Sequence, residues 1–146
     1  MRLISQKAFL LFVLSALACS DTGGPGAVRA RFDLDNIDGR SLPTYPAATP
    51  GLTPTILSNT VVLNDDGHAA IIEHRTQWNG VDVTDTTTYT YTIAGNEIQF
   101  AFSPPCPPNA LCIAPPRGTI FGPLLSLEMG HVNSYIIHYN YRLATS

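Results

Sequence analysis

From residue 28 to the end of the chain, apolar and polar residues alternate along most segments with a period of two. Such alternation is typical of β-strands with one buried face, and no segment shows the 3.6-residue periodicity of an amphipathic helix. The clearest stretch has threonine at every second position from 84 to 92, with Tyr89, Tyr91 and Ile93 between and beyond them. The pattern predicts an all-β fold of about seven or eight antiparallel strands.

Short turn signals separate these strands, at 38–39, 64–67, 79–80 and 95–96. A longer proline-rich connection is expected over residues 43–54, and another over 103–118. The Gly122-Pro123 pair interrupts a strand expected from Thr119 to Met129, which predicts a β-bulge or an edge position there.

The Asn79-Gly80 pair sets the register of the first long hairpin, because Asn-Gly favours a two-residue type I′ turn. That turn places Trp78 at the start of the inward face, and it places His74 opposite Asp85 on the same face. Cross-strand neighbours have Cβ atoms about 5 Å apart, so imidazole and carboxylate are within hydrogen-bonding reach. A polar pair near the mouth of a barrel is the favoured interpretation, and a catalytic pair is the alternative.

The second hairpin turns at Gly95-Asn96, which sets Tyr91 against Phe100 and Tyr89 against Phe102. The threonines then face outward and the aromatic residues inward. A meander of sequential hairpins closes most simply as a small up-and-down barrel, because closure removes exposed strand edges. A two-sheet sandwich is the alternative.

The inward residues are also the candidates for ligand binding, because a small barrel either fills its interior or encloses a ligand. Filled core is favoured over cavity. The candidate ligand-binding residues are Trp78, Tyr89, Tyr91, Phe100 and Phe102, with His74 and Asp85.

Residues 1–18 resemble a bacterial lipoprotein export signal, with Arg2 and Lys7 before a short apolar run and Ser15-Ala16-Leu17-Ala18 before Cys19. The resemblance implies that Cys19 carries acyl chains such as palmitate and becomes the mature N-terminus. Ser20 follows the cysteine, which by the same resemblance favours the outer membrane. An ordinary secretory signal and an uncleaved anchor are the alternatives. Residues 19–27 are then a flexible tether, and 28–146 a single domain.

The charge composition of this domain excludes some classes of partner. Beyond residue 18 the chain has six arginines, no lysine and eleven acidic residues, a net charge of −5. Neither a nucleic-acid partner nor a polybasic lipid-binding face fits this balance, so the membrane is expected to be reached through the lipid on Cys19.

The remaining cysteines, Cys106 and Cys112, are predicted to form a disulfide that clamps a proline-rich loop. Their spacing is not that of a redox Cys-x-x-Cys motif, and two cysteines alone do not make a zinc site. No metal site is expected at the histidines either, because His68 and His74 lie about 20 Å apart along one strand. No cofactor is predicted.

Four segments together resemble small lipocalin-like lipoproteins of bacteria: 32–43 (FDLDNIDGRSLP), 62–67 (VLNDDG), 91–100 (YTIAGNEIQF) and 139–142 (YNYR). The resemblance implies a lipocalin-like barrel in the cell envelope. It implies the fold more than a ligand-carrying role, because the chain lacks the Gly-x-Trp motif of the first lipocalin strand.

The sequence therefore predicts a non-catalytic, lipid-anchored envelope protein that acts as a binding or structural module. If it binds a ligand, the ligand is expected to be an apolar or amphipathic small molecule in the barrel. A protein-interaction or inhibitor module that presents the 106–112 loop is the alternative. An enzyme built on His74 and Asp85 ranks third, because no nucleophile elbow, phosphate loop or metalloprotease motif accompanies them.

Overall fold

The computed structural model describes residues 28–46, 54–110, 112–132 and 135–145. These residues form nine β-strands: β1 (Val28–Ile37), β2 (Arg40–Ser41), β3 (Thr55–Asn64), β4 (His68–Thr76), β5 (Asp82–Ala94), β6 (Glu97–Phe102), β7 (Arg117–Phe121), β8 (Leu124–Val132) and β9 (Tyr135–Leu143). The predicted export signal, Cys19 and the tether lie outside the described residues.

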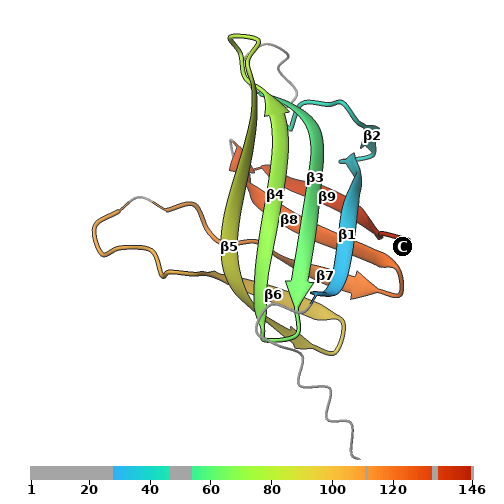
Figure 1. Cartoon of the computed structure of the whole chain (residues 1–146), viewed down its shortest axis with the longest axis vertical. Helices are drawn as coiled ribbons and strands as arrows, with labels where there is room; N and C mark the ends of the chain where they lie inside the picture. Colours follow the sequence, from blue (N-terminus) through green and yellow to red (C-terminus); the bar gives the residue numbers. More distant parts are fainter. Residues whose placement is uncertain (1–27, 47–53, 111, 133–134, 146) are drawn as a thin grey trace, which may run out of the picture.

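The strands form one closed antiparallel barrel (Figure 1). Each strand pairs with the next along the chain, and β1 closes the ring by pairing with β9. The two-residue β2 is an extra strand that folds back on the end of β1. The predicted up-and-down barrel is thus confirmed, and the pairing of β1 with β9 distinguishes it from the sandwich.

The described ladders shift register at four places, and two of these shifts are β-bulges that bring inward a residue which strict alternation would place outside. The register of β1 shifts between Leu34 and Asn36, and that of β3 shifts between Ile56 and Ser58. Each bulge adds one residue to its strand, so side chains three positions apart point the same way. Leu34 and Ile37 are consequently both buried, as are Ile56 and Asn59.

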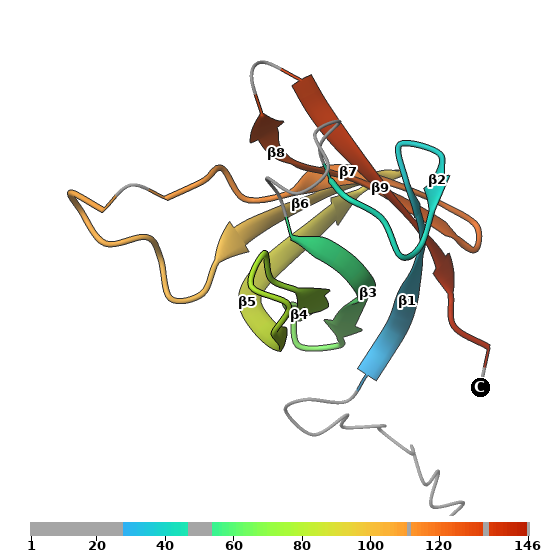
Figure 2. The same ribbon diagram turned by 90° about the horizontal axis from the view of Figure 1, so that it is seen from above.

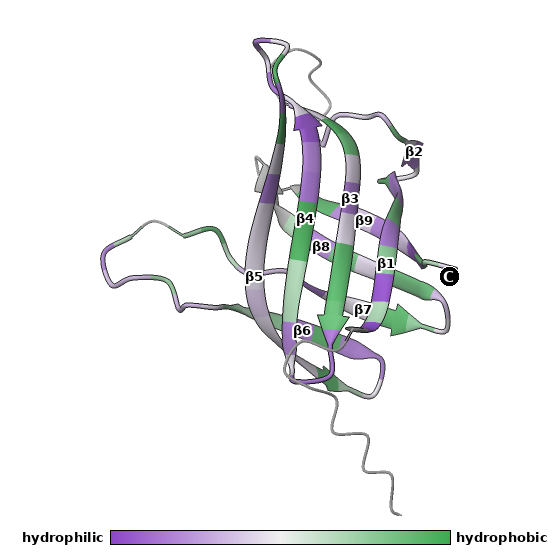
Figure 3. Ribbon diagram, viewed as in Figure 1, coloured by the Kyte–Doolittle hydropathy of each residue, from purple (hydrophilic) through white to green (hydrophobic). Residues whose placement is uncertain are grey.

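The core fills the inside of the barrel with aromatic and aliphatic side chains from every strand except β2 and β7. Its aromatic members are Phe32, Tyr89, Tyr91, Phe100, Tyr139 and Tyr141. The threonines of β5 lie outside, as predicted. Figure 3 colours the ribbon by hydropathy and shows hydrophobic and hydrophilic segments that succeed one another along β3 and β4.

The turn between β5 and β6 agrees with prediction, because Ala94 pairs with Glu97 and Gly95 has a positive φ of 61°. The bulge predicted at Gly122-Pro123 is wrong. Phe121 pairs with Leu124, so these two residues are a complete hairpin turn between β7 and β8. Gly122 has a φ of +56°, and glycine at the first central position is what a type II′ turn requires. Proline at the second position costs nothing there, since the ladder has ended.

The alternating strand directions give the barrel two distinct ends (Figures 1 and 2). At one end, called the N-terminal end, β1 begins and the short turns 64–67, 95–96 and 122–123 lie. At the other, called the loop end, lies the turn of residues 77–81. The long connection from β6 to β7 leaves the barrel wall between the two ends, because Phe102 pairs with Tyr89 and Ser103 donates its N–H to the Thr88 carbonyl, both in the middle of β5. It projects sideways from the barrel in both views.

Candidate functional site

The hairpin of β4 and β5 places different residues inside the barrel from those that the sequence predicts. His74 pairs with Thr84, and Asp85 pairs with Glu73. The pairing of His74 with Asp85 is therefore wrong by one residue. Asp85 remains on the inward face of β5, whereas His74 lies on the outer face of β4.

The turn explains this shift. Gln77 donates its N–H to the carbonyl of Val81 at 2.8 Å, and Gly80 donates to the carbonyl of Gln77 at 2.9 Å. Gly80 has a φ of +79°, while positive φ outside glycine is found at Asp38 and Asn109 among the described residues. A type I′ turn would need positive φ at both central positions. The loop is instead a three-residue turn closed by a glycine bulge.

Trp78 occupies this turn and is 83% exposed. The prediction that it faces inward with the other aromatic residues is wrong for the same reason, since the turn lifts it out of the strand.

An ion-pair cluster takes the place of the predicted pair. One Arg75 guanidinium nitrogen donates to a Glu73 carboxylate oxygen at 2.7 Å, and another donates to Asp85. Glu73 and Asp85 are direct cross-strand partners, and like charges in that position repel. Arg75 offsets the repulsion by binding both carboxylates. The hydrogen bond that Arg75 donates to Glu73 is also the main cause that raises the pKa of Arg75.

The cluster continues into the buried interior through Asn59. This asparagine donates to the second oxygen of Glu73 at 3.2 Å and accepts from the Tyr141 hydroxyl at 3.1 Å. Asn59 is only 1% exposed, so both bonds satisfy polar groups that water does not reach. Asp85, at the other end of the chain of contacts, has a side chain that is 56% exposed. The cluster thus runs from the solvent at the loop end to the centre of the barrel.

Two tyrosines of β9 surround the inner part of the cluster. Tyr139 and Tyr141 are both buried, with ring centroids 6.4 Å apart. Burial raises the pKa of both phenols, because the charged form would lose its hydration, and the charge of Glu73 adds to the effect. Burial also raises the pKa of Tyr89 on β5.

The other predicted ligand-binding residues lie inside the barrel, where they pack against one another. The Tyr89 ring meets Phe100 edge-on at 5.6 Å and Phe102 at 5.3 Å, measured between centroids. Tyr91 lies 6.4 Å from Phe100, and its hydroxyl donates to the Asn64 carbonyl at 2.8 Å. These contacts are those of core residues, and they favour a filled interior at this level of the barrel.

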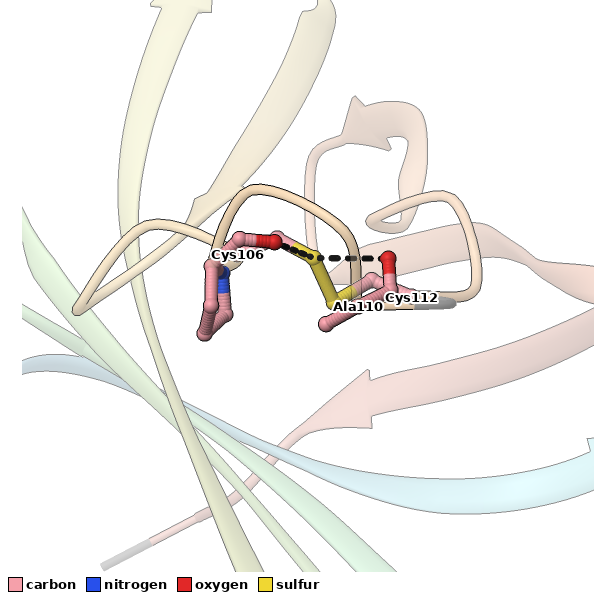
Figure 4. The surroundings of a disulfide bond; sticks show 4 residues. Cys106, Ala110 and Cys112 are labelled. Atoms are coloured by element: carbon pink, nitrogen blue, oxygen red, sulfur yellow. Dashed lines mark hydrogen bonds between the residues drawn. A yellow bond between two sulfur atoms is a disulfide. The ribbon is translucent and has the colours of Figure 1, made fainter.

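The predicted disulfide is present between Cys106 and Cys112, whose Cα atoms are 6.3 Å apart (Figure 4). Inside the ring, Ala110 donates its N–H to the Pro107 carbonyl at 3.1 Å, and Asn109 has a φ of +74°. Asparagine tolerates this conformation, and proline before it suits a type II turn. Residues 107–110 are exposed. The loop therefore holds a defined turn in solvent.

Sequence reasoning missed Asn59, Glu73, Arg75 and Tyr141 as members of one cluster. Residues 69–72 are all apolar, so alternation alone does not say which of them face inward. The bulge in β3, which turns Asn59 inward, carries no glycine that would have marked it. The only available signal was the same-strand pair Glu73 and Arg75, two positions apart and therefore on one face.

Within the described ranges, no group of three or more His, Cys, Asp or Glu residues could hold a metal ion. The same ranges contain no helix of the length and hydropathy needed to cross a bilayer. Comparison of the chain with protein-family models, with curated proteins and with solved structures found no match.

Proposed function

We propose that this protein is a non-catalytic lipoprotein of the bacterial cell envelope, anchored through acyl chains on Cys19, whose barrel presents the disulfide-clamped loop to a protein partner. The export signal that ends at Cys19 supports the anchor, and Ser20 supports the outer membrane. The observation that carries the proposal is the exposure of this clamped loop, which projects from the barrel wall (Figure 1). The chain enters β1 at one end, and the loop leaves the wall after Phe102, the last residue of β6.

This arrangement suits a display scaffold. An anchor on the N-terminal side holds one end near the membrane, so the loop end points away from it. The ring closed by Cys106 and Cys112 restricts the conformations of the free loop, so the loop loses less conformational entropy when a partner binds. Ser103 is fixed to β5 by a hydrogen bond from its N–H to the Thr88 carbonyl at 3.2 Å.

The anchor is tested by the mass of the mature protein. We expect acyl chains on Cys19 and recovery in the membrane fraction, and we expect Cys19→Ala to lose both. A mature protein without acyl mass would contradict the anchor.

The display role is tested by a photo-reactive amino acid introduced at Asn109, with Thr84 on the outer barrel wall as the matched control. Both positions are exposed. We expect one discrete cross-linked protein in cells from position 109 and none from position 84, with loss of the product in Cys106→Ser/Cys112→Ser. Equal products from both positions, or none from either, would count against the proposal.

Capture of an amphipathic small molecule is the second candidate, favoured by the half-exposed ion-pair cluster above an aromatic interior. The polar head group of such a molecule would contact Arg75 and Asp85. Its apolar part would have to displace the aromatic side chains of the core. Tyr91→Ala should then weaken binding of a fluorescent apolar probe such as N-phenylnaphthylamine, whereas changes at 109–111 should not. The packing of Tyr89 against Phe100 and Phe102 ranks this candidate below the first.

A further inference from the structure

Large apolar side chains gather at the N-terminal end of the barrel, around the turn between β7 and β8. Four of them are at least partly open to solvent there: Ile93, Phe121, Leu124 and Leu143. Phe121 is the most exposed, at 74%, and it pairs across the turn with Leu124. Leu143 is tied to the same turn, because its N–H donates to the Pro123 carbonyl at 2.8 Å. We call these four residues the apolar rim.

The neighbouring turn of β5 and β6 belongs to the same surface. Ile120 donates its N–H to the Asn96 carbonyl at 2.8 Å, which joins the two turns. Between them and β1 lies a hollow of about 310 Å³. Its lining includes Ala30, Ile93 and Ile120, and Arg29 is also among the lining residues. An apolar surface with arginine beside it fits the boundary between lipid head groups and acyl chains.

The chain itself brings this end close to a membrane. This step rests on the anchor at Cys19 proposed above. Eight residues, 20–27, separate that cysteine from the first residue of β1. Even a fully extended segment of eight residues spans at most roughly 29 Å. Acyl chains on Cys19 therefore hold the N-terminal end, rather than the loop end, within reach of the bilayer.

The distribution of charged and polar residues indicates which side of the N-terminal end faces the bilayer. The acidic turn with Asp65 and Asp66 joins β3 to β4, which stand four strands around the ring of eight from β7 and β8. It therefore lies opposite the β7–β8 turn, which carries Phe121 and Leu124. The outer face of β5 carries threonine at every second position from 84 to 92, which favours lipid contact at the end rather than along this part of the wall.

We propose that the apolar rim enters the interfacial layer of the membrane, so that the anchored barrel stands on its β7–β8 edge with the loop end facing away. The partner surface is thus a lipid bilayer, bound by apolar burial and not by a basic patch. The lipid anchor attaches the protein to the bilayer, and the apolar rim sets the orientation of the barrel on it.

The test places a single indole either in the apolar rim or in the clamped loop of the full-length lipidated protein. Phe121→Trp/Trp78→Phe reports on the rim, and Ile113→Trp/Trp78→Phe is the matched control in the clamped loop. The two replaced side chains are almost equally exposed, at 74% and 75%. Each variant is reconstituted into phosphatidylethanolamine and phosphatidylglycerol vesicles, with or without brominated acyl chains.

We expect bromine to reduce the emission of the rim variant by about twofold or more and to leave the control nearly unchanged. The wild-type protein, whose only tryptophan is Trp78 at the loop end, should behave like the control. Quenching of the rim variant that is equalled by the control or by Trp78 would mean that the barrel lies on its side, and it would overturn the proposal. No quenching at any of the three positions in a protein that carries acyl chains would overturn it as well.

Two further outcomes distinguish lipid contact at the rim from contact with a protein and from failure of the lipid anchor. A shift of the rim emission to shorter wavelength without bromine quenching would show that a protein, such as a second copy of this chain, covers the rim. If the mature protein carried no acyl chains, the anchor would fail. Addition of brominated vesicles to that protein would then decide whether the rim alone binds lipid.

Discussion

At the scale of single residues, Asn59 is the polar side chain on which the interior depends. It is the link between Tyr141 and Glu73, and it is almost wholly excluded from solvent. A buried polar group that is hydrogen-bonded adds modestly to the free energy of unfolding. Its removal costs more, because its former partners are left buried without a hydrogen bond.

We therefore expect Asn59→Ala to lower the free energy of unfolding by about 1–3 kcal/mol, since both Tyr141 and Glu73 lose a partner. Urea denaturation measures the change. In a double-mutant cycle with Tyr141→Phe, the two effects should be less than additive, because each variant removes the same hydrogen bond. Strict additivity would show that this bond has no energetic role.

The buried phenols make a prediction about pH. The pKa values of Tyr139 and Tyr141 are raised above 10.0 in the folded state, whereas the unfolded chain has ordinary tyrosines. The unfolded state thus loses these protons first. Stability is fully present below about pH 10 and falls as pH rises further.

The expected slope is about 1.4 kcal/mol per pH unit for each of these phenols. Urea midpoints measured from about pH 9 to about pH 11 test it. The slope should decrease in Tyr139→Phe and in Tyr141→Phe. An unchanged slope in both variants would assign the alkaline loss of stability to other groups.

At the scale of elements, the barrel requires a close approach between β7 and β8. A Cβ placed on Gly118 would overlap the backbone carbonyl oxygen of Ser126. No side chain can move away to relieve this clash, because the obstacle is backbone. The alternation of apolar and polar residues does not indicate this close approach, since a glycine at position 118 predicts only a weak strand.

Gly118→Ala should consequently destabilise the protein by about 1–3 kcal/mol through forced separation of the two strands. Thr119→Ala, on the exposed face of the same strand, is the control and should change stability by less than about 0.5 kcal/mol. Thermal unfolding followed by circular dichroism measures both. Similar effects of the two substitutions would contradict the role given to the close approach.

At the scale of the whole molecule, the stability of the barrel does not depend on the clamped loop. The members of the core lie outside residues 103–116, apart from the buried Pro116 at the edge of β7. Removal of the disulfide should therefore affect the loop and leave the barrel intact.

For Cys106→Ala/Cys112→Ala we expect a loss of up to about 2 kcal/mol, the chain-entropy value for so short a ring. Far-ultraviolet circular dichroism should still report the full strand content, and unfolding should remain cooperative. Loss of the barrel signal would show that the clamp organises more than its own loop.

The sequence by itself determined the fold class, the strand meander, the register of β5 with β6 and the disulfide. Each of these follows from local information: period-two alternation, a Gly-Asn turn and a pair of cysteines close in the chain. The inward position of Tyr89, Tyr91 and Phe100 followed in the same way, because one face of β5 is all threonine.

Only the tertiary structure decided the register of β4, the two bulges and the polar cluster of Asn59, Glu73, Arg75 and Asp85. Residues 69–72 are apolar on both faces, so burial against β3 had to choose between them. That choice moved His74 to the outside and Trp78 into solvent. A one-residue shift changes every face of a strand, and local sequence does not fix it where both faces are apolar.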